Sequence, residues 1–386
     1  MTKFLHIGDI HAGKTLHNKS RNDDAEYAIS QVIDFVKKEP VDFILMAGDI
    51  FDQYNPDAEA TKIIFDFMVR ELNALKIPVV MIAGNHDGQA FFEGYKTLAK
   101  YANMHLFVRP SPDDFVITIK DTNIICVPYI SPKFIARLWE DNSTAEYAHK
   151  VETFINTLIS KAPKNTFNIL LSHMMAKSAK ITKSEREASV SEYYAINLDN
   201  INNLKTLDYV ALGHVHRYQK ISTTTDAYYT GSCFQIDFNE EGQEKYFNFV
   251  VLEQQSTNKV ENIKLGIKNQ LKTLKVDAKS LNIKDIENVK GYVRVIIDDT
   301  IENTRLLESK LKSEHIASKI LEIRRNVFEK PDIEADLNKI RDSLVDFYEE
   351  YYKAKYREDL PEDLKKAFLE LQYKVEHEEE NLKNSD

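Results

Sequence analysis

The sequence predicts an α/β (α+β) fold in which helices flank a sandwich of two β-sheets, followed by a small α+β module and a helical hairpin. Strand and helix patterns alternate over the first hundred residues, and shorter apolar runs follow after about Leu106. The segment 331–386 is polar and amphipathic. Alternating strands and helices indicate a layered sheet, whereas amphipathic stretches indicate surface helices.

The expected elements of the first part follow one another in a βαβαβ order. They are Phe4–Ile7, Ala25–Lys38, Val41–Ala47, Ala58–Leu75 and Val79–Ile82. This order is typical of parallel strands with helices packed on the sheet faces. Because ligands of such sheets bind at the carboxyl ends of strands, functional side chains are expected directly after each strand.

The second half of this domain is expected to consist mainly of shorter strands, with a helix near Ala145–Ser160. The strands are Phe115–Ile119, Asn123–Val127, Asn168–Leu171, Tyr209–Leu212 and Phe247–Leu252. The polar stretch Gln254–Asn262 then indicates a boundary, so we place the first domain at residues 1–263.

A second, α+β module is predicted at residues 264–330, and a helical segment at 331–386. The module contains Leu271–Val276, Tyr292–Ile297, a helix at Glu302–Lys312, and Ile316–Ile323. Its 15 basic and 10 acidic residues give it a net charge of +5, within a chain whose net charge is −10. A basic module suits a polyanionic partner, although an unevenly charged solvated surface gives the same count.

The helical segment carries apolar residues spaced alternately by four and three. They are Ile333, Leu337, Ile340, Leu344, Phe347, Tyr351, Leu364, Phe368, Leu371 and Val375. Two such helices form a hairpin with too little core to be stable alone. Two interpretations therefore stay open, packing on the chain's own body and docking on a partner helix or coiled coil.

No apolar run reaches the roughly 18–20 residues that cross a bilayer, and no secretory leader is recognised. We therefore expect a cytoplasmic protein without membrane contact. The only two cysteines, Cys126 and Cys233, are too few for a disulfide framework or a cysteine-based zinc site.

Five short motifs with potential metal ligands follow the expected strands. They are Gly8-Asp9-Ile10-His11, Gly48-Asp49, Gly84-Asn85-His86-Asp87, Ser172-His173 and Gly213-His214-Val215-His216. A lone Asp-x-His or Gly-His means little, but five motifs in this order at strand ends are very unlikely to arise by chance. Oxygen and imidazole ligands without thiolate favour Mn²⁺ or Fe²⁺, with Zn²⁺ and Mg²⁺ as alternatives.

Paired metal ions about 3.5–4 Å apart can activate water and stabilise phosphoryl oxygens, so the motifs predict phosphate-ester cleavage. Asp9 and His11 can bind one metal, and Asn85 the second. Asp49 could bridge the two ions. His86 could protonate the leaving oxygen, with Asp87 orienting it or supporting its loop.

These motifs resemble the signature of calcineurin-type metallophosphoesterases. More closely, the chain resembles the SbcD family, the bacterial counterparts of the Mre-eleven DNA double-strand-break repair nuclease. The closer resemblance rests on Leu5–Gly13, Asp49-Ile-Phe-Asp52, Tyr209–His216 and Thr230–Phe238. It implies a 3′-to-5′ double-strand exonuclease and single-strand endonuclease whose second module caps DNA.

The resemblance also implies roles for individual residues. One Mn²⁺ would be held by Asp9, His11, Asp49 and His216, and the other by Asp49, Asn85, His173 and His214. His86 would be the catalytic acid. Many archaeal and eukaryotic members have histidine where this chain has Asp52, which leaves the efficiency of the exonuclease open.

The resemblance further implies a homodimer paired with an ABC-type ATPase of the SbcC kind, acting on double-strand ends, hairpins and single strands of DNA. The segment 331–386 would bind the ATPase, and Ile64, Phe67 and Met68 are candidates for the dimer interface. Two alternatives remain. A small-molecule phosphatase or cyclic phosphodiesterase could use the same motifs, and a non-catalytic scaffold could keep the fold.

Overall fold

The structure is a computed structural model of the chain. It describes residues 1–139, 147–163, 167–185, 194–254, 257–277, 279–299, 301–313, 315–327, 344–356, 358–369 and 371. The chain divides into two compact units, Met1–Asn326 and Val327–Asp386, and each is described by itself.

The first unit contains a six-stranded sheet in the order β14-β13-β1-β4-β5-β6. Strands β1, β4, β5 and β6 are parallel to one another, whereas β13 pairs with both β1 and β14 in antiparallel fashion. The strands are β1 (Thr2–Ile7), β4 (Phe43–Met46), β5 (Val79–Ile82), β6 (Met104–Phe107), β13 (Lys245–Leu252) and β14 (Lys259–Leu265).

A second six-stranded sheet has the order β11-β12-β10-β9-β8-β7. Its four inner strands are parallel, and β7 and β11 close the edges in antiparallel fashion. The strands are β7 (Val116–Ile119), β8 (Thr122–Val127), β9 (Phe167–His173), β10 (Tyr209–Gly213), β11 (Gln219–Ile221) and β12 (Ala227–Tyr229).

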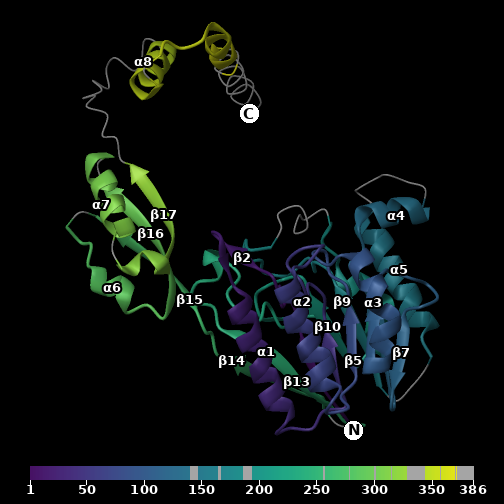
Figure 1. Cartoon of the computed structure of the whole chain (residues 1–386). Coiled ribbons are helices and arrows are strands. Elements are labelled where there is room, and N and C mark those ends of the chain that lie inside the picture. The colour runs from purple at the N-terminus through teal and green to yellow at the C-terminus, as the bar shows by residue number, and fades with distance from the viewer. Residues whose placement is uncertain are drawn as a thin grey trace. The chain divides into compact units, whose positions relative to one another are not determined.

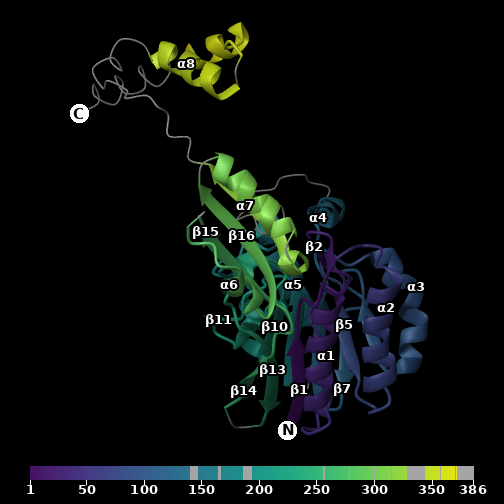
Figure 2. The ribbon, with the colours of Figure 1, turned by 60° about the vertical axis from the view of Figure 1, so that its left-hand side comes forward.

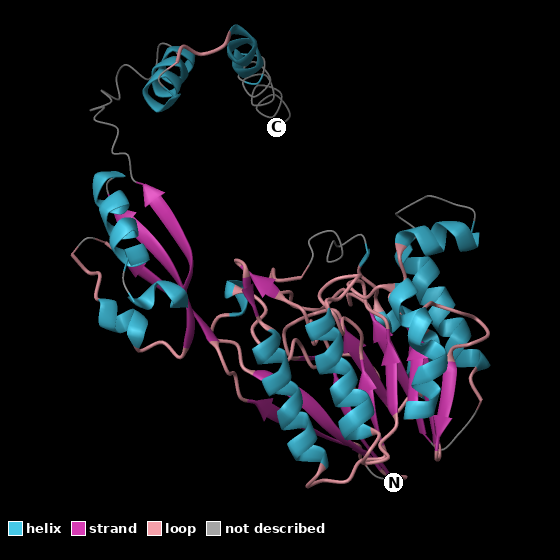
Figure 3. Cartoon of the chain, viewed as in Figure 1, coloured by secondary structure: helices cyan, strands magenta, loops and turns pink. Residues whose placement is uncertain are grey.

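The two sheets pack face to face, and helices cover their outer faces (Figures 1 and 3). Alternate residues of each strand point to opposite sides. Phe4, Leu45 and Val80 therefore meet Ile169 and Ala211 between the sheets. The outer face of the first sheet packs on α1 (Asn22–Val36), α2 (Ala58–Phe65) and α3 (Gln89–Ala99), and that of the second on α4 (Pro132–Trp139) and α5 (Tyr147–Lys161). The predicted sandwich flanked by helices is confirmed.

The single helix expected at Ala58–Leu75 consists of an α-helical and a π-helical part. The α-helix α2 ends at Phe65 and continues as a π-helix, η1 (Asp66–Leu72). Ile64, Phe67 and Met68 are at most 2 % exposed and lie in the core beneath the first sheet. Their assignment to a dimer surface is therefore wrong, because the apolar face of this helix is covered by the chain's own core.

The α+β module of the first unit is a three-stranded sheet in the order β15-β16-β17. Its elements are β15 (Gln270–Val276), α6 (Ile283–Glu287), β16 (Gly291–Asp299), α7 (Ile301–Ser313) and β17 (Ile320–Val327). Figure 2 shows α7 lying along β16, and the core between them includes Val293, Val295, Leu307 and Leu311. The strand expected at Ile316–Ile323 begins only at Ile320, because residues His315–Lys319 form a 3₁₀ helix.

The predicted boundary between residues 263 and 264 falls inside β14, whose Leu265 still pairs with Lys245 of β13. The first sheet therefore extends two residues beyond the boundary, and the division into a core and a capping domain stays a prediction.

A buried arginine links the module to the core. Arg21, which precedes α1, is fully buried and pairs with Asp24 at 2.7 Å. Its Nη2 donates to the carbonyl of Asn269 at 3.0 Å, and its guanidinium lies 5.5 Å from the ring centroid of Tyr292 in β16. Because both charges are buried, removing one partner would leave the other uncompensated, which is strongly destabilising.

The second unit contains α8 (Leu344–Tyr356) and a helical stretch at 362–369. The Tyr348 and Phe368 rings stack at 4.6 Å, and Lys365 pairs with Glu349, so the two helices form the expected hairpin. Tyr351, Leu364 and Leu371 are exposed. The positions Ile333, Leu337, Ile340 and Val375 lie outside the described residues, as do the side chains of Leu344 and Phe347.

Among the helices in the described ranges, none combines the length and the apolar character that a membrane crossing requires.

Candidate metal centre

The five motifs meet at one edge of the sandwich. Asp9 and His11 follow β1, Asp49 follows β4, and Asn85 and His86 follow β5, so the first sheet contributes five side chains. His173 ends β9, and His214 and His216 follow β10 of the second sheet. All eight are buried, with at most 8 % of each residue exposed.

Four of these residues have an unusual backbone conformation. Asp9, His11 and Asp49 have φ angles of 48°, 49° and 48°, and His214 has a φ of 102°. Left-handed backbone costs energy for residues other than glycine, and such strain is concentrated at functional sites. The rest of the fold therefore holds these side chains in place against their local preference.

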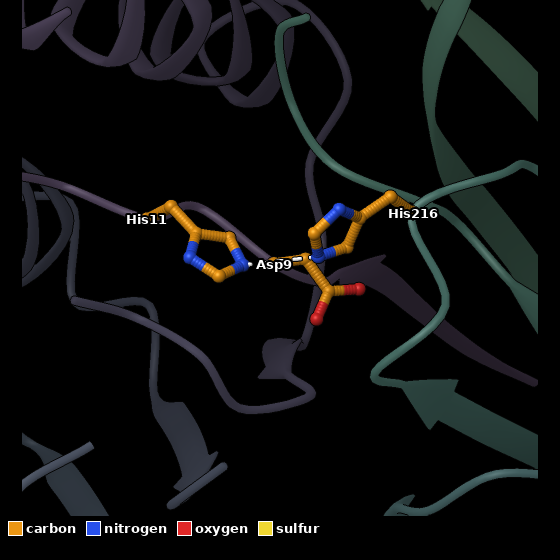
Figure 4. Close-up of side chains that lie close together, drawn as sticks. All are labelled: Asp9, His11 and His216. Carbon is orange, nitrogen blue, oxygen red and sulfur yellow. Dashed lines mark hydrogen bonds between the residues drawn. The ribbon is translucent and has the colours of Figure 1, made fainter. Parts of the chain in front are cut away.

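A first cluster consists of Asp9, His11 and His216. Figure 4 shows the two imidazole rings turned towards each other beside the Asp9 carboxylate, and their Nε2 atoms lie 3.2 Å apart. The other ring nitrogens are engaged by carboxylates. His11 Nδ1 lies 3.2 Å from Asp52 Oδ1, and His216 Nδ1 lies 3.0 Å from Glu240 Oε1.

A second cluster consists of Asp49, His173 and His214, with Asn85 between the two rings. Asn85 Oδ1 lies 2.9 Å from His173 Nε2 and 2.8 Å from His214 Nδ1. His173 Nδ1 donates to the carbonyl of Ala47 at 2.7 Å, which leaves Nε2 directed at Asn85 and Asp49.

Asp49 connects the two clusters. Its Oδ2 lies 3.3 Å from His173 Nε2 of the second cluster and 3.8 Å from His11 Nε2 of the first. Its Oδ1 accepts the backbone N–H of His86 at 2.7 Å. One carboxylate oxygen thus faces ring nitrogens of both clusters, which is the position required of a bridging ligand.

The donor set fits two cations. If the Nδ1 atoms of His11 and His216 carry the protons that Asp52 and Glu240 accept, two Nε2 lone pairs face each other, and only a cation or an extra proton relieves their repulsion. The buried Oδ2 of Asp9 finds no hydrogen-bond donor within the part of the chain that the structure describes.

Electrostatics favour added positive charge at the same place. Burial raises the pKa of Asp9 to about 6, against the influence of His173 and His216. Burial opposes a charge on His173, yet the carboxylates of Asp49 and Asp9 raise the pKa of its imidazole to about 9. Carboxylates buried beside imidazoles therefore draw either protons or metal ions into the site.

His86 lies beside the first cluster. Its ring makes an edge contact with the ring of His11 at 4.7 Å, and its Nδ1 lies 2.9 Å from the carbonyl of Asp52. A carbonyl can only accept, so Nδ1 donates and Nε2 is the nitrogen that can exchange a proton with another group in the neutral ring.

Asp87 holds the loops of the site together. Its carboxylate accepts the backbone N–H groups of Gly84 at 2.8 Å, Phe51 at 3.0 Å and Ile50 at 3.2 Å. Gly84 has no room for a side chain, because a Cβ there would lie 2.2 Å from Asp49 Oδ1. These contacts hold the Asn85-His86 loop against the loop that follows Asp49.

No sequence motif indicates the groups that support His216. Glu240, in a short 3₁₀ helix (η8, Phe238–Glu240), is fully buried and also accepts from Lys245 Nζ at 2.5 Å and Ser232 Oγ at 2.8 Å. Ser184 Oγ lies 2.8 Å from His216 Nδ1. In the sequence Glu240 stands in an acidic turn that is typical of a solvent-exposed loop.

We expect Glu240→Gln to weaken metal binding by about 10–100-fold, because outer-sphere carboxylates orient ligand histidines and raise their basicity. Calorimetric titration with Mn²⁺ measures this affinity. Glu241→Gln, the same change one residue further at a side chain paired with Lys272, is the matched control. Equal affinities of the two variants would contradict the assignment.

Residues 2–218 match the calcineurin-like phosphoesterase family, and the chain belongs to that family. This class accounts for the sandwich and for a site with candidate residues for two metal ions. The chain is also similar to the SbcD subunit of the nuclease SbcCD from Staphylococcus epidermidis (strain ATCC 12228 / FDA PCI 1200). The two are 28 % identical over 255 residues, which cover 65 % of this chain and 66 % of that relative.

A solved structure of a dimetal phosphatase from Danio rerio is 11 % identical to the chain, with a TM-score of 0.40. The match covers 69 % of this chain and 99 % of that one.

Proposed function

We propose that this phosphoesterase is a Mn²⁺-dependent DNA nuclease of the SbcCD type, with 3′-to-5′ double-strand exonuclease and single-strand endonuclease activity. The observation that carries the proposal is the pair of buried clusters joined by Asp49. Similarity to the SbcD subunit of a nuclease supports DNA as the substrate.

In this proposal Asp9, His11, Asp49 and His216 hold one ion, and Asp49, Asn85, His173 and His214 hold the other. When bound, the ions supply an activated water and neutralise charge on the phosphoryl oxygens. The chain's own residues fix this arrangement, because Asp52, Glu240 and the carbonyl of Ala47 orient the ligand rings.

His86 supplies the proton to the leaving oxygen in the proposed reaction. Its Nδ1–H is held by the carbonyl of Asp52, so a protonated Nε2 is the group that can donate. Its backbone N–H, bonded to Asp49 Oδ1, fixes its distance from the bridging ligand. Asp87 holds this loop against the loop that follows Asp49.

The proposal is tested by comparing two DNA substrates with one small phosphate ester, all with Mn²⁺ present. Linear duplex DNA with a labelled 3′ end should release its label, and a single-stranded circle should be cut. A generic aryl phosphate serves as the small substrate. Cleavage of the aryl ester alone would refute the nuclease and support the small-molecule phosphatase that shares the fold.

We further propose that the protein acts as a homodimer and that the helical hairpin binds an ABC-type ATPase of the SbcC kind. Similarity to a subunit of SbcCD supports the ATPase as a partner, and the exposed Tyr351, Leu364 and Leu371 support the hairpin as its binding site. An apolar stripe on an exposed helix is typical of docking to a partner helix.

Removing residues 331–386 should abolish binding of the ATPase and leave the intrinsic nuclease activity within about twofold, because the metal centre lies wholly in the unit Met1–Asn326. Co-purification with the ATPase and cleavage of the 3′-labelled duplex measure the two properties. Tight binding by the shortened chain would refute the docking assignment.

A further inference from the structure

We propose that a pocket beside the second metal cluster binds a nucleotide of single-stranded nucleic acid next to the cleaved phosphodiester. Arg109 and Lys133 would contact backbone phosphate, and Phe134 with Tyr129 would stack on a base. This inference rests on the proposed nuclease function and adds a substrate subsite to it.

The pocket has a volume of about 540 Å³ and is lined by Gln89, Arg109, Tyr129, Ser131, Lys133 and Phe134, among others. This volume lies in the range of ligand sites and is large enough for a nucleotide. None of the described residues that line it is acidic. An anionic ligand therefore meets no like charge on the walls.

The pocket adjoins the metal centre. The ring centroid of Tyr129 lies 6.2 Å from those of His173 and His214, and its plane is tilted by 27° from that of His214. The backbone N–H of Tyr129 donates to the carbonyl of Ala83, directly before the Gly84–Asp87 loop. Gln89, which also lines the pocket, follows the same loop. A strand cleaved at the metals would thus continue into this pocket.

The two positively charged side chains of the pocket, Arg109 and Lys133, are available to a ligand. The Arg109 side chain is 62 % exposed, and its nearest acid, Glu93, is 3.9 Å away and itself 41 % exposed, which is a weak surface pair. Lys133 is exposed at the start of α4. Guanidinium and ammonium groups beside a nuclease centre suit the backbone phosphates of a polyanion better than a single small ester.

The aromatic side chains give the pocket its preference for unpaired bases. Phe134 is half-buried and held by an edge contact with Phe154 at 6.1 Å, so its ring is already positioned before a ligand binds. Neutral Gln89 and Ser131 add hydrogen-bonding groups. Stacking on such rings tolerates any base because every base has a π-face, so we expect little sequence preference.

The binding experiment uses a fluorescent oligothymidylate, with chelator present, and follows anisotropy as the salt concentration is changed. We expect the double variant Arg109→Ala/Lys133→Ala to bind about tenfold more weakly. The slope of log affinity against log salt should fall by about 1.4, since each lost phosphate contact of a single strand contributes about 0.7. Lys161→Ala/Lys205→Ala, which removes two exposed lysines outside the lining, is the control.

The activity experiment compares cleavage of the same oligonucleotide with that of bis-p-nitrophenyl phosphate, both with Mn²⁺. The double variant should lose about tenfold in kcat/KM on the oligonucleotide and stay within twofold on the small diester. Phe134→Ala should likewise lose activity on the oligonucleotide and keep it on the small diester. Phe134→Trp should restore cleavage of the oligonucleotide. Equal salt slopes of the double variant and wild type, or equal losses on both substrates, would overturn the subsite.

Failure of the nuclease proposal would give a different result from failure of the subsite. If the wild-type protein cleaves the small diester and no oligonucleotide, the nuclease function fails. If the wild-type protein cleaves both and the pocket variants match it on both, only the subsite fails.

Discussion

His86→Asn is expected to lower the rate of DNA cleavage by about 10²–10⁴-fold while the protein keeps its fold and its metal ions, since proton transfer typically contributes this much. Asparagine removes the imidazole ring that is proposed to donate the proton. It retains the backbone N–H that bonds Asp49 Oδ1 at 2.7 Å, so the Asp49 carboxylate stays in place. Single-turnover cleavage of a labelled duplex measures the effect.

Metal content by elemental analysis is the companion measurement for this variant. His105→Asn, a half-buried histidine in β6 outside the site, is the control and should behave as wild type. Full cleavage by His86→Asn would remove His86 from the role of acid. Loss of metal would instead place it among the ligands.

Asp49→Asn should have the second large effect, because one carboxylate faces both clusters. We expect bound metal to fall from two ions to one or fewer. Cleavage should drop by about 10³-fold or more, since a catalytic metal contributes several kcal/mol and each 1.4 kcal/mol is tenfold in rate. Asparagine tolerates the left-handed backbone at this position and can still accept the His86 N–H.

Mn²⁺ stoichiometry and cleavage rate are the two readouts for Asp49→Asn. Asp114→Asn, at a side chain that is 64 % exposed and outside both clusters, removes the same charge and should change neither. Two tightly bound ions in Asp49→Asn would show that the clusters bind metal independently and that Asp49 does not bridge them.

The strands that carry the motifs could be predicted closely because their apolar runs are short and end at glycine. Phe4–Ile7, Val79–Ile82 and Tyr209–Leu212 each lie within a strand of the structure. Parallel pairing then brings the carboxyl ends to one edge, which is why side chains 205 residues apart, such as His11 and His216, could be expected together.

The features that could not be predicted depend on tertiary contacts. A period of three to four residues does not distinguish an apolar face covered by the chain's own sheet from one covered by a partner. The pattern therefore does not reveal that Ile64, Phe67 and Met68 lie in the core. Likewise, nothing local distinguishes the buried Glu240 from its neighbour Glu241. Only the approach of Lys245 and His216 from β13 and the loop after β10 makes it part of the site.

The origin of the ligands in both sheets has a consequence for how the protein folds. Pairs such as His214 with Asp9 and His173 with Asn85 are 205 and 88 residues apart, so closing these loops costs entropy that only a formed sandwich repays. No short stretch of nascent chain can gather the full set. With the proposed ligands, metal capture would therefore be a late event that locks a completed fold, and cleavage activity would mark chains in which both sheets have already docked.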